Sequence, residues 1–115
     1  AEASPAWVYP WMNIAVLRAR LGLMDGQLFH AYHQAVKTGP WERNTMAPLV
    51  SLGATVHRFA TPEQKHFIEQ YINRVATANG PLIASYLRQR GSRPFICRGL
   101  KQMQLTQAYK HICSG

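Results

Sequence analysis

The segment TPEQKHFIEQYINRV, residues 61–75, carries the clearest local structural signature in the chain. Thr61 can cap a helix, Pro62 suits the first helical position because no N–H is needed there, and Gln64 lies where its side chain can reach back to the cap. Apolar residues then recur at helical spacing, at positions 67, 68, 71, 72 and 75. The segment therefore predicts a helix that buries one face and ends at residues 79–80.

The chain before this segment has the patterns of three more helices, which we place over residues 12–21, 25–38 and 45–59. Gly22 can end the first of them. Asp25 is a good N-cap for the second, and Gly39 followed by Pro40 is a clear stop signal. Thr45 is the candidate cap of the third.

The first eleven residues have a different composition. Pro5 and Pro10 bracket an aromatic stretch, which predicts that residues 1–11 form an extended arm rather than a helix. We expect its rings to fold back onto the core, with stacking on bases or insertion into a partner's apolar groove as the alternative. These aromatic residues are Trp7, Tyr9 and Trp11.

Farther along the chain, Pro81 can start a new helix that residues 91–94 break. A last helix is expected over residues 99–112, with a short extended piece at residues 95–97 before it. The rest of the chain has no alternating β pattern, and its 115 residues suit one hydrophobic core. We therefore predict an all-α fold in which residues 1–115 form a single domain, a compact bundle of five or six short helices with the aromatic arm.

Charge is distributed unevenly along the chain. The net charge is +8, from 13 Lys and Arg residues against 5 Asp and Glu residues. No acidic side chain follows Glu69, whereas seven basic ones do: Arg74, Arg88, Arg90, Arg93, Arg98, Lys101 and Lys110. Without nearby carboxylates, such side chains create a positive potential that attracts phosphates, acidic lipid head groups or an acidic protein. A role in solubility alone is the alternative.

The segment LRQRGSRPFICRGLK, residues 87–101, holds five of these bases. Its glycines and proline are expected to keep it partly off a helix, so that guanidinium groups can spread along a phosphate backbone. Phe95 offers a stacking surface, and a helix start near Gly99 would favour anions. The predicted nucleic-acid-binding residues are Arg88, Arg90, Arg93, Arg98 and Lys101. The alternative is that these bases offset a helix dipole or lie on a solvated loop.

Residues 12–38 contain a second pattern that suggests nucleic-acid binding. Leu17, Leu21 and Leu28 have the spacing of a helix-turn-helix, in which inward leucines set the angle between two helices that meet at a glycine turn. The second helix would then present polar side chains to a groove, namely Gln27, His30, Gln34 and Lys37. Two amphipathic helices of an ordinary bundle produce much the same pattern, and this alternative stays open.

Cys97 and Cys113 are the only cysteines, and both two free thiols and one disulfide are compatible with an even number. A continuous helix over residues 99–112 would separate them by roughly 20 Å, whereas a disulfide needs Cα atoms within about 7 Å. We therefore predict two free thiols and a reducing, cytoplasmic location. A shorter last helix would permit the bridge, which is typical of exported proteins.

Few residues suit catalysis or metal binding. Glu63 and Glu69 are the only carboxylates close together, and their spacing puts them on opposite sides of a helix, which does not suit paired acid–base catalysis. His30 and His33 lie three positions apart on one helix, but a zinc site needs three or four ligands, so we interpret them as solvated. The common catalytic motifs are missing. We predict no enzymatic activity, no cofactor and no metal.

These features predict a small basic protein that binds the phosphate backbone of nucleic acid, with DNA favoured, through an Arg-rich C-terminal face. The alternative is a helical adaptor, with export left open, that docks an acidic protein partner and needs an exposed apolar patch beside the basic face. A homodimer that forms through the weakly amphipathic last helix is a further hypothesis. The chain has no run of about 18 apolar residues, so no transmembrane helix is expected.

Overall fold

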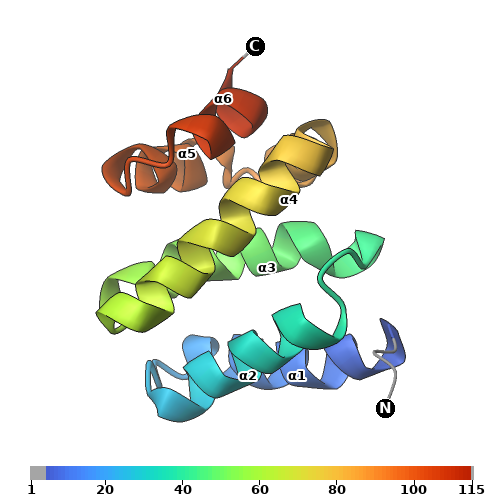
Figure 1. Cartoon of the computed structure of the whole chain (residues 1–115), viewed down its shortest axis with the longest axis vertical. Coiled ribbons are helices and arrows are strands. Elements are labelled where there is room, and N and C mark those ends of the chain that lie inside the picture. Colours follow the sequence, from blue (N-terminus) through green and yellow to red (C-terminus); the bar gives the residue numbers. More distant parts are fainter. Residues whose placement is uncertain (1–4, 115) are drawn as a thin grey trace.

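The longest helix of the protein crosses the middle of the molecule, with two helices toward one end and two toward the other (Figure 1). The computed structural model describes residues 5–114, and within this range the chain forms six α-helices and one 3₁₀ turn. They are α1 (Pro5–Arg20), α2 (Gly26–Thr38), α3 (Arg43–Val56), the turn η1 (His57–Phe59), α4 (Pro62–Gln89), α5 (Arg93–Gln102) and α6 (Thr106–Cys113). The predicted all-α fold is confirmed. No helix of the described residues has the length and apolar composition needed to cross a membrane.

Helix α4 begins as the sequence predicts. The Gln64 N–H donates a hydrogen bond to the Thr61 hydroxyl at 3.2 Å, and the Thr61 N–H donates one to the Gln64 side-chain oxygen at 2.9 Å. This reciprocal capping box satisfies two N–H groups that the start of a helix leaves unpaired.

The predicted end of this helix is a kink rather than an end. Asn79 has φ −140° and ψ 37°, outside the helical region, and the chain continues as a helix to Gln89. Pro81 has no N–H to donate, and its ring would clash with the carbonyl group four residues earlier in a regular helix. The two helices predicted on either side of residues 79–80 are therefore the two halves of α4.

Next to this kink, Gly80 lets α6 approach α4 closely. A Cβ atom at Gly80 would lie 2.5 Å from the backbone oxygen of His111 and 2.9 Å from its Cβ. Earlier on α4, the side-chain oxygen of Asn73 accepts a hydrogen bond from the Ala108 N–H at 3.2 Å. Because Ala108 lies in the first turn of α6, Asn73 satisfies an N–H that the start of this helix would leave unpaired. The two contacts hold α6 across α4.

Replacing Gly80 with alanine tests the close approach of α6. We expect Gly80→Ala to lower the free energy of unfolding by about 2 kcal/mol, because overpacking a tight contact typically costs about 1–3 kcal/mol. The matched control is Gly26→Ala on α2, where an added Cβ meets nothing within 4 Å. Urea unfolding would measure both variants, and equal stability of the two would contradict the contact.

Helices α2 and α3 begin with side-chain caps. Asp25 caps α2 as predicted, since its carboxylate accepts a hydrogen bond from the Leu28 N–H at 3.1 Å. The cap of α3 is Glu42, whose carboxylate accepts a hydrogen bond from the Asn44 N–H at 3.1 Å. The predicted cap, Thr45, is instead fully buried inside the first turn, so α3 begins two residues earlier than the sequence suggests.

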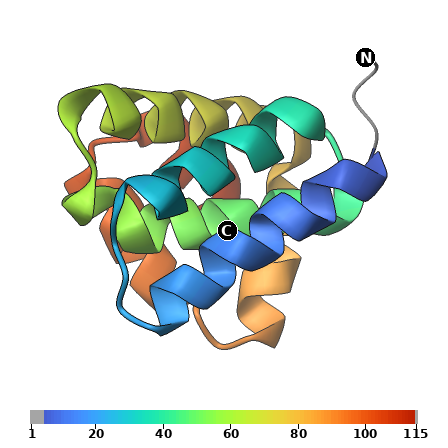
Figure 2. The same ribbon diagram turned by 90° about the horizontal axis from the view of Figure 1, so that it is seen from below.

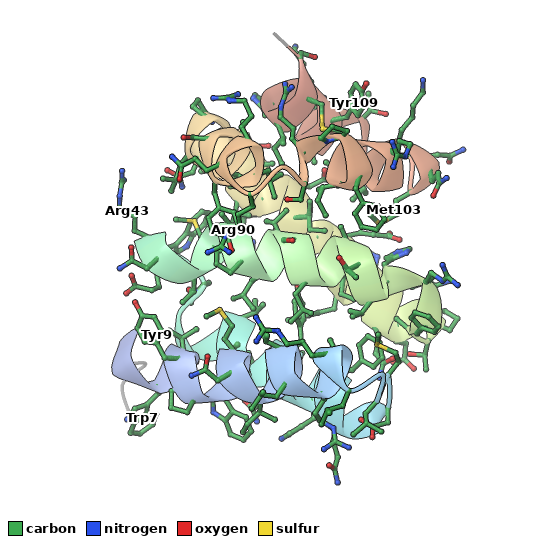
Figure 3. All side chains as sticks on the ribbon, turned by 180° about the vertical axis from the view of Figure 1, so that it is seen from behind. Trp7, Tyr9, Arg43, Arg90, Met103 and Tyr109 are labelled. Atoms are coloured by element: carbon green, nitrogen blue, oxygen red, sulfur yellow. A yellow bond between two sulfur atoms is a disulfide. The ribbon has the colours of Figure 1, made fainter. Side chains whose placement is uncertain are left out.

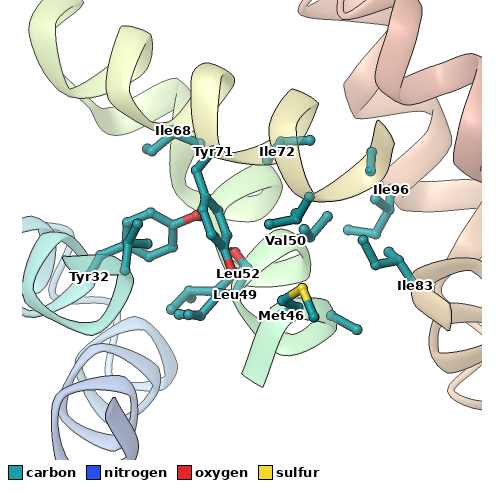
Figure 4. Packing of buried hydrophobic residues seen from close by; sticks show 14 of the residues in the cluster. Tyr32, Met46, Leu49, Val50, Leu52, Ile68, Tyr71, Ile72, Ile83 and Ile96 are labelled. Atoms are coloured by element: carbon teal, nitrogen blue, oxygen red, sulfur yellow. Dashed lines mark hydrogen bonds between the residues drawn. The ribbon is translucent and has the colours of Figure 1, made fainter. Parts of the chain in front are cut away.

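Two buried tyrosines lie in the core where α2, α3 and α4 meet (Figure 4). The rings of Tyr32 and Tyr71 pack edge to face, with centroids 6.4 Å apart. The Tyr32 O–H donates a hydrogen bond to the Leu49 backbone oxygen at 2.9 Å, and the absence of a side chain at Gly53 leaves room for this hydroxyl. The Tyr71 hydroxyl has no hydrogen-bond partner among the described residues. Burial raises the pKa of both phenols.

Only one of these two hydroxyls has a hydrogen-bond partner, so their removal is expected to have opposite effects on stability. Tyr71→Phe should raise the free energy of unfolding by about 1 kcal/mol, because it deletes a buried donor without a partner. Tyr32→Phe should lower it by about 1 kcal/mol, because the Leu49 oxygen loses its donor. Thermal and urea unfolding measure both. Destabilisation of the two variants by the same amount would contradict this account of the core.

The aromatic segment near the N-terminus is helical, so the predicted extended arm is wrong for residues 5–11. Residues 1–4 of that arm lie outside the described residues. Val8 supplies the physical reason, because its side chain is fully buried and packs against Gly39. Burial of such a side chain contributes about 1.5–3 kcal/mol, which offsets the helical hydrogen bond that Pro10 cannot make.

The three aromatic side chains of this segment have different surroundings. Tyr9 and Trp11 pack partly against the core, as expected, whereas Trp7 is exposed. Trp11 also contacts the edge of His30 on α2, with ring centroids 5.5 Å apart. One side of α1 therefore packs against the core, and the Trp7 ring on another side is exposed to solvent.

Helices α1 and α2 lie side by side as a hairpin (Figure 2). Leu28 is buried in the core, but the exposed fractions of the Leu17 and Leu21 side chains are 56% and 72%. Leucines that face outward cannot set the angle between two packed helices. The inward-leucine premise of the helix-turn-helix hypothesis is therefore wrong, and the pair is an ordinary helical hairpin.

Candidate functional site

The basic segment that the sequence places partly off a helix is almost entirely helical. Residues 93–102 form α5, so the extended piece predicted at residues 95–97 is wrong. Only the three residues between α4 and α5 leave the helical path. Four of the five bases are consequently held at fixed angular positions on two helices, and Arg90 lies in the connection between them.

The predicted last helix is interrupted at residues 103–105, where the chain reverses between α5 and α6. Gln104 has a φ of +60°, in the left-handed region. The Leu105 N–H donates a hydrogen bond to the Leu100 oxygen, and the Gln104 N–H donates one to the Lys101 oxygen, both at 3.0 Å. These two bonds form a Schellman motif, which normally has glycine at the left-handed position. Glutamine carries no such signal, which explains why the sequence pattern suggests one continuous helix.

This reversal brings the two cysteines together. The Cα atoms of Cys97 and Cys113 are 5.9 Å apart, and their sulfur atoms form a disulfide. The prediction of two free thiols is wrong, because it depended on a straight helix through residues 99–112. The Arg93 Nε–H adds a second link by donating a hydrogen bond to the Ile112 backbone oxygen at 3.2 Å. Helices α5 and α6 are thus joined covalently and by a hydrogen bond.

A hollow of about 400 Å³ lies against α5 and α6. We call it the basic hollow, and its lining residues are Arg93, Pro94, Cys97, Arg98, Lys101, Tyr109 and Cys113. At 100° per residue, the α5 members of this set share one side of the helix, while Ile96 and Leu100 on another side are buried in the core. Burial of the apolar side therefore turns three of the five predicted binding residues toward the same hollow.

The other two predicted residues, Arg88 and Arg90, are exposed at the end of α4 and do not line the basic hollow. The Arg90 guanidinium lies over the Tyr86 ring, 4.6 Å from its centroid. Figure 3 shows Arg90 well apart from Tyr109, which marks the α6 side of the hollow. The five predicted residues consequently form two groups on neighbouring helices, and not one continuous cluster.

Two of the five acidic side chains, Asp25 and Glu69, are paired away from these bases. Within the described residues, Arg18 forms a salt bridge with Asp25 at 2.6 Å, and a ring nitrogen of His57 forms a hydrogen bond with the Glu69 carboxylate at 2.6 Å. Both lie outside α5 and α6, and the lining of the basic hollow contains no carboxylate side chain. The positive potential predicted from the sequence is therefore retained at this end of the fold.

Sequence reasoning missed the contribution of α6 to this site. Tyr109 places a half-buried ring beside the bases of α5, and Asn73 on α4 holds the start of α6 in position. The even cysteine count was the available signal. A bridge between Cys97 and Cys113 requires the chain to reverse between them, which places α6 alongside α5.

The candidate metal and acid–base residues are not brought together. The described residues contain no group of three or more potential metal ligands. His33 packs on the Phe67 ring, with centroids 4.3 Å apart, and partial burial lowers its pKa, with smaller contributions from Lys37 and His30. Glu69 pairs with His57, not with Glu63. The basic hollow, by contrast, brings three of the predicted binding residues together.

Comparisons with protein-family models, curated proteins and solved structures found no significant match to this chain.

The disulfide is expected to stabilise the α5–α6 pair strongly. It closes a loop with a sequence separation of 16, and a loop of about 15 residues corresponds to roughly 3 kcal/mol of stabilisation. The double variant Cys97→Ser/Cys113→Ser should therefore lose about 3 kcal/mol in urea unfolding. Addition of a thiol reductant should lower the stability of the wild-type protein but not of the variant. Equal stability of wild type and variant before reduction would contradict a formed bridge.

Proposed function

We propose that the protein binds the phosphate backbone of nucleic acid, with DNA favoured, through the basic hollow. The observation that carries this proposal is the presence of Arg98 and Lys101 on the same side of α5, around a hollow whose lining has no carboxylate side chain. Two cations held by a helix lose less freedom on binding than cations on a flexible loop. The guanidinium of Arg98 can form two parallel hydrogen bonds with a phosphate, whereas Lys101 acts as a point charge.

The remaining residues of the site have supporting roles. Tyr109 supplies a ring at the edge of the hollow, where an exposed base could stack. Arg88 and Arg90 extend the positive surface toward the end of α4, and the stacking of Arg90 on Tyr86 limits its mobility. Arg93 lines the hollow but also bonds to α6, so we assign it a role in holding the site together. None of these contacts selects a base sequence, so the proposed binding is general for phosphate backbones.

The disulfide bears on the compartment in which this binding would occur. Free thiols would favour the cytoplasm, but a bridge such as Cys97–Cys113 is typical of proteins in oxidising compartments. We therefore propose an exported protein, for which the anionic partner would be nucleic acid outside the reducing cytoplasm.

The adaptor alternative requires an apolar patch next to the basic face. On α5 one large apolar side chain, Phe95, is exposed. Most other exposed apolar side chains belong to α1 and its connection to α2, at the far end of the molecule from α5 and α6 (Figure 1). This arrangement supports nucleic acid over an acidic protein partner, since phosphate binding needs no apolar surface.

The double variant Arg98→Gln/Lys101→Gln tests the site while leaving Arg93 in place. Its affinity for duplex DNA should fall about tenfold at low salt, and the slope of log Kd against log salt should decrease by about two, because each phosphate contact contributes about 0.9 to that slope. Fluorescence polarisation with duplex DNA, single-stranded DNA and RNA at several salt concentrations measures both quantities.

The matched control is Arg20→Gln/Lys37→Gln, which removes one Arg and one Lys from exposed positions on α1 and α2. Its net charge equals that of the α5 variant, so a general electrostatic effect would change both variants alike. We expect the control to keep nearly the wild-type salt slope. Equal loss of binding by the two variants, or no loss in either, would overturn the assignment of the site. Binding to an acidic protein but to none of the nucleic acids would support the adaptor instead.

A further inference from the structure

Helix α1 has an apolar stripe on the side that faces away from the core. Val8 and Ala15, on the inner side, are fully buried, and the contacts of α1 with other elements are made to α2 and α3. The outer stripe consists of large side chains that remain exposed, namely Trp7 at 54%, Ile14 at 42% and Leu17 at 56% on α1, and Leu21 at 72% directly after its last residue. None of these four side chains belongs to the buried core.

The spacing of the stripe is that of a helix–helix seam. Trp7, Ile14 and Leu21 are seven residues apart, with Pro10 and Leu17 between them. This alternation of three and four residues is the heptad pattern through which α-helices pack side by side. The stripe is therefore better suited to pack against another helix with the same apolar spacing than against a flat surface.

The charges beside the stripe are compatible with contact between two copies. The Arg18 side chain forms two hydrogen bonds with Asp25, at 3.1 and 2.6 Å, and hydrogen bonding to Arg18 lowers the pKa of Asp25 to about 2. The pair thus stays ionised and mutually neutralised at neutral pH. Arg20 is then the one unneutralised charge on the described part of α1.

We propose that the stripe of α1 binds a second copy of this chain, with the two α1 helices antiparallel about a two-fold axis near Ile14 and Leu17. In this arrangement Ile14 of each copy faces Leu17 of the other, and Trp7 packs near Leu21 of the other copy. A parallel arrangement would instead place the two Arg20 side chains at the same level of the pair, where like charges repel. The antiparallel pair places them at different levels, about 14 Å apart along the helix axis.

The same charges argue against a membrane surface as the occupant. Attachment to an anionic bilayer favours a row of bases along the rim of an apolar face, but Arg18 on this rim is neutralised by Asp25.

The expected dimer is weak. Two helices of 16 residues bury less than the roughly 800 Å² per partner of a standard interface, so the association should depend on concentration. The basic hollow lies at the other end of the fold and remains accessible in this dimer.

Sedimentation velocity over a range of protein concentrations tests the dimer. We expect the wild-type protein to shift from monomer to dimer between about 1 µM and about 1 mM, as mass action requires. Leu17→Glu should be monomeric throughout, because it places a charge in the seam. The control is Gln70→Glu, which adds the same charge to an exposed position of α4, a helix without contacts to α1, and it should dimerise like wild type.

Circular dichroism would show that both variants keep their helices, and Leu21→Glu provides a second seam variant at the most exposed position of the stripe. A wild-type protein that stays monomeric over the whole range would overturn the proposal. Monomeric protein that binds vesicles of anionic lipid and loses this binding on Leu17→Glu would identify a membrane as the occupant, and would also overturn it.

Cross-linking tests the antiparallel orientation. Residues 7 and 21 lie about 21 Å apart along α1. In a mixture of Trp7→Cys and Leu21→Cys proteins, a short thiol-specific cross-linker should join one variant to the other and leave each variant alone unlinked. Efficient self-linking of Trp7→Cys would show a parallel pair and overturn the proposed geometry. The native cysteines are held in their disulfide and would not compete.

Discussion

Helix α6 can lie across α4 because residue 80 has no side chain. This close contact occurs beside the kink in α4, and Asn73 anchors the start of α6 two turns earlier on the same helix. The Cys97–Cys113 bridge then fixes α5 against α6. Helix α5 makes few direct contacts with α4, and it is positioned largely by α6 and α3. The placement of α5 therefore depends on the contacts that hold α6 against α4. Contacts with neighbouring helices, rather than signals in its own sequence, thus determine where α5 lies.

The arrangement of charge follows from this position. Helix α5 buries Ile96 and Leu100, so its remaining sides face solvent or α6, and its bases lie on the side that borders the hollow. The sequence has no acidic side chain after Glu69, and none lines the hollow. The fold therefore converts a difference in composition between the two halves of the sequence into a local positive surface. The apolar stripe of α1 lies at the opposite end, which separates the two proposed binding surfaces.

The helices that could be predicted from the sequence are those that short-range signals specify. Thr61 and Gln64 mark the start of α4, and Asp25 marks the start of α2, because a cap and its hydrogen bonds lie within a few residues of each other. The features that could not be predicted depend on contacts between distant residues. Val8 is helical because Gly39 and the core receive its side chain, and no local pattern reports this. At Gln104, tertiary packing imposes a left-handed turn on a residue that gives no such signal.

At the candidate site, too, some features could be predicted from the sequence and others depend on contacts between distant residues. The excess of bases after Glu69 is visible in the sequence, and three of the residues it singles out, Arg93, Arg98 and Lys101, line one hollow. Their shared side follows from the helical periodicity of α5, whereas the addition of Tyr109 and Cys113 to the same hollow depends on the reversal of the chain at residues 103–105. An error in that one turn also produced the wrong state of the cysteines. The turn, the bridge and the site could be predicted only together.

The central claim is that the geometry of the basic hollow matters, in addition to the number of bases. The most direct measurement compares DNA binding by the wild-type protein with that by Cys97→Ser/Cys113→Ser, at a temperature where circular dichroism shows both to be folded. The substitutions leave the formal charge unchanged and remove the link that holds α5 beside α6. The account predicts several-fold weaker binding by the unbridged protein. Identical affinity and salt dependence would show that charge alone is sufficient, and would contradict it.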